Sequence, residues 1–240
     1  IPFDPLEFGI PPNALQQTDS AQLLALIAAK QALDNIESTS GCEIDRTRTS
    51  VMLGVASATE LTAHMAGRLQ RPVWVNALRQ SGLGEADVLA ITKRMEDHYI
   101  EWKESTFPGL LGNVVAGRIA NRLDLGGSNF VTDAACASSL SALQIALHEL
   151  RAGDSDTVLA GGVDALNDIL MYMCFSKTPA LSPTGDCRPF SMEADGTMLG
   201  EGVGILALRR LSDAERDGNI IHAVIRGIGG GSDGKGTAIY

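Results

Sequence analysis

Apolar residues recur along the chain with two alternating periods, one typical of helices and one typical of strands. In the first helical stretch, Leu23, Ile27 and Leu33 lie on one face. Asp19 precedes this stretch as a candidate N-cap, with Gln22 three residues further on. The pattern therefore predicts that a long helix begins close to residue 18.

Further segments continue this alternation to residue 229. Helices are expected at 85–103 and 137–153, and within 105–127 after Pro108 and Gly109. Buried strands are expected at 49–57 and 129–135, and further strands at 157–165, 203–211 and 220–229, with a short polar turn of helix between the last two. The apolar face of the helix at 85–103 would comprise Val88, Ile91, Met95, His98 and Trp102. The inward face of the helix at 137–153 would comprise Leu140, Leu143, Leu147 and Leu150. Strands that alternate with helices predict an α/β protein with parallel strands.

Composition and charge narrow the class of protein. The chain has 240 residues, of which 45% are apolar and 20% charged, so it can bury a large core and is not a disordered segment. Lys and Arg number 19 against 29 Asp and Glu, a formal charge of −10. This charge repels phosphate backbones and anionic lipid surfaces, so we expect neither nucleic acid nor a membrane as a partner.

The cysteines and the N-terminal sequence indicate the compartment. Cys42, Cys136, Cys174 and Cys187 are far apart and include no C-x-x-C pair, which is typical of a reducing cytoplasm. No apolar run approaches the roughly 20 residues of a membrane span, and IPFDPLEFGIPP lacks the features of a signal peptide. We therefore expect a cytoplasmic protein.

Cys136 is the strongest candidate for a chemical role. It stands between an expected strand and an expected helix, and its neighbours are small: Ala134, Ala135, Ala137, Ser138 and Ser139. A thiol at the start of a helix lies near unpaired N–H groups and the positive end of the helix dipole, and both favour the thiolate. The alternative is that Cys136 is a buried cysteine that serves as a small apolar residue.

The segment VTDAACASSLSAL (131–143) resembles the active-site segment of β-ketoacyl synthases, in which an Asp-x-Ala-Cys-x-Ser-Ser run carries the acylated cysteine. Other blocks of the chain are similar to consecutive blocks of that family, namely 3–26, 108–127, 160–190, 195–218 and 220–234. Within the family, the chain is most similar to the ketosynthases of iterative enediyne, polyunsaturated fatty acid and heterocyst glycolipid synthases. The segments that carry this similarity are DAACASSL, MYMCFSKTPALSPTGD and SDGK.

The resemblance implies a thiolase-like fold, an αβαβα layered sandwich, of which the chain would hold the first half and the start of the second. Residues 1–240 would then be a partial ketosynthase domain: a lead-in at 1–17, the N-terminal half at 18–218 and the start of the C-terminal half at 219–240. The strand at 129–134 would pair with the same strand of the second subunit in a homodimer. A partial domain of this kind is expected not to catalyse condensation alone.

The resemblance also implies a reaction. Cys136 would accept an acyl chain from an acyl carrier protein or coenzyme A, and a carbanion from decarboxylated malonyl carrier protein would attack the resulting thioester. The domain itself would need no cofactor, since its acyl and malonyl thioesters are carried on the phosphopantetheine of the carrier. A non-catalytic partner of the chain-length-factor kind is the alternative, although such partners usually replace the cysteine. An enzyme that acts on free coenzyme A esters is a third hypothesis.

The histidines do not match the family's catalytic pattern. None of the four, which are His64, His98, His148 and His222, stands in the His-Gly-Thr or Gly-His context of that family. Each is more simply a surface residue of a helix or strand. Cys136 is therefore the only catalytic residue that the resemblance carries over to this sequence.

Other motifs favour structural roles. GGGSDGKGT (229–237) nearly matches a phosphate-binding loop but has Gly236 where a hydroxyl is needed. Turn formation explains four scattered aspartates better than a metal site does; these are Asp164, Asp168, Asp186 and Asp195. Glu201 is either a buried carboxylate that supports the site or part of a surface turn. An acyl tunnel or, preferably, a packed core would contain Met171, Tyr172, Met173 and Phe175.

Overall fold

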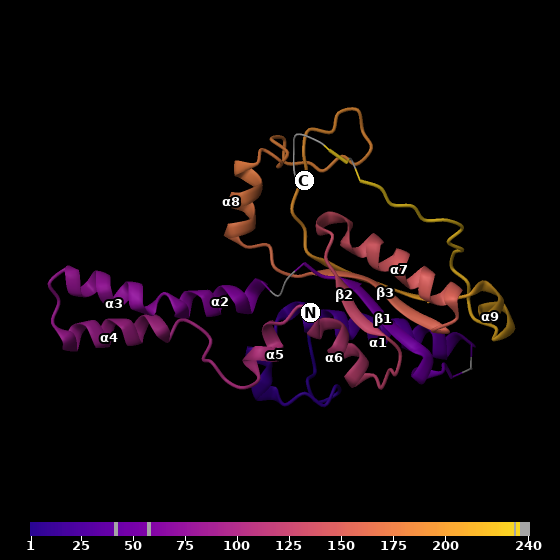
Figure 1. The fold of residues 1–240 in the computed structure, drawn as a ribbon, viewed down its shortest axis with the longest axis horizontal. Coiled ribbons are helices and arrows are strands. Elements are labelled where there is room, and N and C mark those ends of the chain that lie inside the picture. Colours follow the sequence, from indigo (N-terminus) through magenta and orange to yellow (C-terminus); the bar gives the residue numbers. More distant parts are fainter. Residues whose placement is uncertain (41–42, 57–58, 233, 236–240) are drawn as a thin grey trace. The chain divides into compact units, whose positions relative to one another are not determined.

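The computed structural model describes residues 1–40, 43–56, 59–232 and 234–235, and the chain divides into two compact units (Figure 1). One unit contains the β-sheet and is called the sheet unit; it comprises Ala25–Ala56, Gly112–Gly162 and Gly204–Tyr240. The other, called the helical unit, comprises Ile1–Leu24, Ser57–Leu111 and Val163–Val203. The expected boundaries at residues 17 and 218 stay predictions.

A four-stranded sheet with the order β2-β1-β3-β4 lies at the centre of the sheet unit. Its strands are β1 (Thr49–Gly54), β2 (Asn129–Thr132), β3 (Thr157–Asp164) and β4 (Gly202–Arg209). Both β2 and β3 pair parallel with β1, which confirms the expectation for these three strands. At β4 the expectation of parallel strands is wrong. Arg210, which follows β4, donates to the carbonyl of Ser155, which precedes β3, so β4 runs antiparallel to β3.

The central strands are apolar on both faces. Every residue of β1 is buried, as the sequence predicted, and Val158, Leu159 and Ala160 of β3 are also fully buried. By contrast, β2 was expected to be buried, yet its residues are only half-buried or exposed. The physical reason is that β2 lies at the edge of the sheet, where only β1 pairs with it among the described strands.

Helices cover both faces of the sheet (Figure 1). On one face lies α7 (Ser138–Ala152), and on the other lies α6 (Val114–Arg122), with α1 (Ser20–Ser40) beyond it. The buried residues of α7 include Ala142, Ala146 and Leu150, whereas Leu140 is 64% exposed, so its predicted inward orientation is wrong. Small residues face inward because α7 lies close to the sheet. Its core partners are Met52, Val158 and Ala160.

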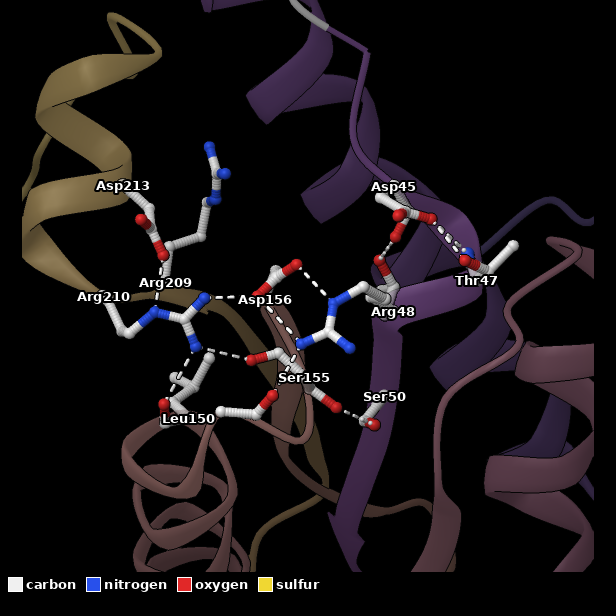
Figure 2. A network of polar contacts seen from close by, with 12 residues as sticks. Asp45, Thr47, Arg48, Ser50, Leu150, Ser155, Asp156, Arg209, Arg210 and Asp213 are labelled. Atoms are coloured by element: carbon white, nitrogen blue, oxygen red, sulfur yellow. Dashed lines mark hydrogen bonds and ion pairs between the residues drawn. The ribbon is translucent and has the colours of Figure 1, made fainter.

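Side chains at the amino ends of β1 and β3 form an ion-pair network in the sheet unit (Figure 2). The Asp156 carboxylate accepts hydrogen bonds from Arg48 Nε at 2.6 Å and from Arg210 Nη2. Arg210 also donates to Asp213 at 2.6 Å and to the carbonyls of Leu150 and Ser155. These bonds to Arg48 and Arg210 lower the pKa of Asp156 to about 2.

The helical unit contains several elements that the sequence pattern did not indicate. Its helices are the 3-10 helix η1 (Pro12–Gln17), α2 (Thr59–Leu69), α3 (Arg71–Gln80), α4 (Glu85–Glu96), α5 (Thr106–Leu110) and α8 (Ile169–Lys177). Of these, α2, α3 and α8 were not predicted. The expected helix at 85–103 is shorter than predicted, since α4 ends at Glu96 and Trp102 is 57% exposed.

Asp19 and Gln22 join the start of α1 to other parts of the helical unit. Asp19 accepts from the backbone N–H of Ala21, as expected for an N-cap, and burial raises the pKa of its carboxyl. Gln22 Nε2 donates to the carbonyls of Pro108 and Gly109 at 3.0 and 2.8 Å. These contacts of Gln22 hold α5 against the start of α1.

The structure differs from the prediction in two segments, 1–17 and 220–229. The expected extended lead-in instead forms turns and η1, and it buries Phe8 and Ile10. The strand expected at 220–229 is wrong for this structure: these residues form no strand within the described part of the chain, and all but Ile228 are exposed. The short helical turn expected before it is confirmed as α9 (Leu211–Arg216).

Within the described residues, no helix combines the length and the apolar character that crossing a bilayer requires.

Candidate active site

Cys136 lies at an elbow between β2 and α7, at the carboxyl edge of the parallel strands. It occupies the middle of a 3-10 turn, η3 (Ala135–Ala137), directly before the first residue of α7. Its side chain is exposed. The alternative interpretation, a buried cysteine that fills the core, therefore does not fit the structure.

Hydrogen bonds fix the shape of this elbow. The Ala135 N–H donates to Asp133 Oδ1 at 2.9 Å, and the Ala137 N–H donates to the Ala134 carbonyl at 3.0 Å. The Ser138 hydroxyl accepts from the Ala134 N–H at 2.8 Å and donates to the Ala135 carbonyl at 2.6 Å. Hydrogen bonds therefore hold the turn both before Cys136, at Ala134 and Ala135, and after it, at Ala137.

Ala135 has a φ of +48°, in the left-handed region that residues with a Cβ rarely adopt. A strained residue directly before an exposed cysteine matches the geometry by which strand-turn-helix elbows present a nucleophile.

Two glycines allow α7 to approach the sheet at the elbow. A Cβ on Gly54, at the end of β1, would lie 2.4 Å from the Ser139 nitrogen and 2.8 Å from the Ser138 Cβ. A Cβ on Gly162, in β3, would lie 2.9 Å from the Ser139 Cβ. The first turn of α7 therefore occupies the space that side chains at positions 54 and 162 would need.

The electrostatics at Cys136 follow from the helix that begins beside it. No side chain caps the N-terminus of α7. The N–H groups of a first helical turn have no partner within the helix, and the positive end of the helix dipole lies there. Cys136 therefore lies beside backbone N–H groups that favour negative charge on an oxygen atom bound there.

Sequence reasoning missed three groups that build the elbow. Two are side chains that hydrogen-bond the turn, the hydroxyl of Ser138 and the carboxylate of Asp133. The third is a pair of glycines, Gly54 and Gly162, whose lack of a side chain leaves room for the first turn of α7. Ser138 and Asp133 were visible only as neighbours of Cys136. The two glycines lie within predicted parallel strands. A glycine in a strand can indicate that a helix approaches the sheet closely there, and this was the available signal.

Among the described residues, Cys174, Cys187 and the histidines lie outside the elbow. Cys174 and Cys187 are also exposed, whereas Cys42 is outside the described residues. On the surface lie His98, His148 and His222. His64 is half-buried on α2, with its ring edge-on to Tyr99 at 6.2 Å.

The other candidates take structural positions. Asp168 caps α8, Asp195 accepts from Ser182 and Thr184 at 2.7 Å, and the exposed Glu201 accepts from the Asn167 N–H at 2.7 Å. Residues of α8 are not part of a core: none is buried, and Met173 is 55% exposed.

No metal or phosphate site emerges from these candidates. Among the described residues, no cluster of three His, Cys, Asp or Glu side chains could hold a metal ion. Gly236 and Thr237 of the phosphate-loop hypothesis lie outside the described residues.

A cavity of the sheet unit lies away from Cys136. It has a volume of about 530 Å³ and is lined by Leu147, Leu150 and Arg151 of α7, by β4 and by the segment 219–225. This cavity adjoins the C-terminal half of α7, whereas Cys136 precedes its first residue. The cavity is therefore separate from the elbow that carries Cys136.

The sheet and the elbow define an α/β protein of the kind that presents a nucleophile between a strand and a helix. Residues 2–214 match the family model of the β-ketoacyl synthase N-terminal domain. The chain belongs to the β-ketoacyl synthase family. This confirms the family that the segment around Cys136 indicated.

Curated relatives are large synthases. The chain is 38% identical over 238 residues to a polyunsaturated fatty acid synthase component of Thraustochytrium sp., covering 99% of this chain and 8% of that protein. It is 32% identical over 237 residues to a phenolphthiocerol/phthiocerol polyketide synthase component of Mycobacterium tuberculosis, covering 99% of this chain and 11% of that protein. The chain thus spans a small part of each relative.

Solved ketosynthase structures share the fold. The ketosynthase from module 6 of the bacillaene synthase of Bacillus subtilis 168 matches with a TM-score of 0.65 and 27% identity, over 91% of this chain and 31% of that one. A cysteine-to-serine mutant of the same ketosynthase matches with a TM-score of 0.72 and 26% identity, over 99% and 34% of the two chains. The α/β fold with a mixed four-stranded sheet is therefore that of the N-terminal half of a ketosynthase.

Proposed function

We propose that this chain is part of a β-ketoacyl synthase in which Cys136 carries the acyl chain during decarboxylative condensation. The observation that carries the proposal is the exposed thiol at a strained elbow beside an uncapped helix N-terminus. Membership of the β-ketoacyl synthase family supports it.

The reaction consists of two acyl exchanges: the acyl group passes first from the carrier sulfur to the Cys136 sulfur and then from that sulfur to a carbanion. The Cys136 thiolate attacks the carbonyl of an acyl thioester, the bond from that carbonyl to the carrier sulfur breaks, and the carrier thiol leaves with a proton. A malonyl thioester on a second carrier then loses carbon dioxide, and its carbanion attacks the Cys136 thioester. A carbon–carbon bond forms, the bond from Cys136 Sγ to the acyl carbon breaks, and a β-ketoacyl carrier is released.

The elbow contributes charge stabilisation and orientation to both exchanges. Negative charge develops on the thioester oxygen in each, and backbone N–H groups, including that of Cys136, stabilise it when they are already oriented. The side chain that assists decarboxylation is not assigned to any of the four histidines of this sequence. No cofactor is assigned to the domain itself, since the phosphopantetheine belongs to the carrier.

The partners follow from the same proposal. An acyl carrier protein delivers both thioesters. The homodimer would form through β2, whose half-buried residues lie at the edge of the sheet. An unpaired edge strand can continue its sheet with a second copy of the chain.

The experiment compares the full-length protein with its Cys136→Ser variant, using acyl carrier protein, malonyl carrier protein and carbon dioxide release. We expect loading and condensation to disappear in the variant, because a serine hydroxyl does not ionise near neutral pH. Cys174→Ser is the matched control, since Cys174 is also exposed but lies within α8, and it should keep both activities.

Two outcomes would favour the alternatives. Loading that is equal in the Cys136→Ser variant and the parent would support a non-catalytic, chain-length-factor-like partner. Equal rates with coenzyme A esters and with carrier-bound acyl groups would support an enzyme of free coenzyme A esters.

A further inference from the structure

Ser138 is buried in the first turn of α7, and only 7% of its surface is exposed. Its hydroxyl makes two hydrogen bonds to the elbow. It accepts from the Ala134 N–H at 2.8 Å and donates to the Ala135 carbonyl at 2.6 Å. One hydroxyl therefore joins the peptide group before Ala134 to the peptide group that links Ala135 to Cys136.

The peptide group between Ala135 and Cys136 contains two atoms that matter for the proposed reaction. Because a trans peptide is planar, its carbonyl and its N–H point in opposite directions. The bond from Ser138 to the Ala135 carbonyl thus also sets the direction of the Cys136 N–H. The same peptide plane fixes where the Cys136 side chain begins.

Ala135 needs such a constraint. Its φ of +48° lies in the left-handed region, where the Cβ of an L-residue crowds its own backbone carbonyl. The Asp133 carboxylate accepts from the N–H of Ala135, and because a carboxylate has no proton to donate, it cannot bond the Ala135 carbonyl. The Ser138 hydroxyl bonds that carbonyl, on the far side of the strained residue.

We propose that Ser138 is a positioning residue: its hydroxyl holds Ala135 in the left-handed conformation and thereby orients both the thiol and the N–H of Cys136. This inference rests on the proposed function only in taking Cys136 as the nucleophile. Ser138 itself does not contact the reacting atoms.

The first test measures the rate of Cys136 alkylation by iodoacetamide in Ser138→Ala and in the parent, with peptide mapping. We expect a decrease of about 5-fold to 30-fold at Cys136, the factor that corresponds to losing 1 to 2 kcal/mol. Cys174 and Cys187 are exposed and serve as internal controls, whose rates stay unchanged if the fold is intact. Ser139→Ala, which removes an exposed hydroxyl from the same turn, should leave the Cys136 rate unchanged.

The second test separates positioning from a general loss of structure. Glycine adopts positive φ without the cost that alanine incurs. In an Ala135→Gly background, the elbow no longer depends on the hydroxyl to keep its conformation. We therefore expect Ser138→Ala to reduce the Cys136 rate by less than about 3-fold in that background. The double variant also keeps the test informative if the single Ser138→Ala change prevents folding.

Two results would overturn the proposal: an unchanged Cys136 rate in Ser138→Ala, or an equal loss in the parent and Ala135→Gly backgrounds. Alkylation uses no acyl substrate, so these results are independent of the proposed condensation. A protein that shows the Ser138 effect but accepts no acyl group would contradict the proposed function and leave the positioning role in place.

Discussion

The Asp156 carboxylate at the amino ends of the strands offers a quantitative test of the fold. It accepts from Arg48 at 2.6 and 3.2 Å and from Arg210. Asp156→Asn keeps the volume of the side chain and removes its charge. Arg48 is then left with the Gly153 carbonyl, and Arg210 with Asp213 and two carbonyls.

The expected loss of stability follows from the pKa of Asp156, which the two arginines lower from 3.8 to about 2. A shift of this size corresponds to about 2 kcal/mol. The side chain is 33% exposed, so screening by water reduces the expected effect to about 1 kcal/mol at pH 7. Because the folded-state pKa is lowered, this stabilisation is present above pH 3.8 and is lost as the pH falls towards 2.

Urea unfolding of the parent and the Asp156→Asn variant between pH 7 and pH 3 measures this difference. The gap in unfolding free energy should stay nearly constant down to about pH 4.5 and shrink to about half near pH 3. Asp97→Asn is the control, since it breaks an exposed pair with Lys93 and should leave the midpoint unchanged. A gap that is absent at pH 7, or that persists undiminished at pH 3, would refute the role assigned to the network.

Three further predictions test the elbow and the helix that follows it. Gly54→Ala should destabilise the protein by about 1 to 3 kcal/mol in chemical unfolding and slow Cys136 alkylation, because the added Cβ meets the first turn of α7. The control is Gly204→Ala in β4, where a Cβ has no neighbour within 4 Å, and it should change neither the stability nor the alkylation rate. Gly153→Ala should lower the unfolding free energy by about 1 kcal/mol, because Gly153 ends α7 with a φ of +81°, and an unchanged midpoint would count against this. In limited iodoacetamide labelling of the parent, Cys136 should react faster than the other two exposed cysteines, and faster labelling of Cys174 or Cys187 would contradict the assignment.

Sequence patterns predicted all four strands of the sheet. All of β1 and the first four residues of β3 are buried, so their apolar runs are the clearest signals. The segment at 220–229 has a similar apolar pattern but forms no strand in the described residues. A strand needs a neighbour for its backbone groups, and an apolar run does not specify that neighbour.

Helix faces were harder to predict because size, as well as apolar character, decides which residues face the sheet. In α7 the leucines suggested the inward face, yet Ala142 and Ala146 lie against the sheet. Their small side chains fit the short distance between α7 and the sheet that Gly54 and Gly162 permit. In α8 the run from Ile169 to Phe175 is apolar on every side, so no helical period could be seen.

The elbow was predictable in part. Its position between a strand and a helix followed from the alternation of patterns, and the cysteine followed from the family resemblance. The positive φ of Ala135 could not be predicted, since alanine gives no sign of that conformation. The structure explains this conformation by the hydrogen bonds that Asp133 and Ser138 make to the N–H and the carbonyl of Ala135.

The most direct measurement of the central claim is the location of the acyl group after the full-length protein is incubated with an acyl carrier thioester. Digestion and mass spectrometry of the intact peptides would show where the group is bound, and hydroxylamine would show whether it is a thioester. The account predicts a single hydroxylamine-labile acyl group on the peptide that contains Cys136, absent from the Cys136→Ser variant. An acyl group on Cys174 or Cys187, or one that persists in the variant, would contradict it.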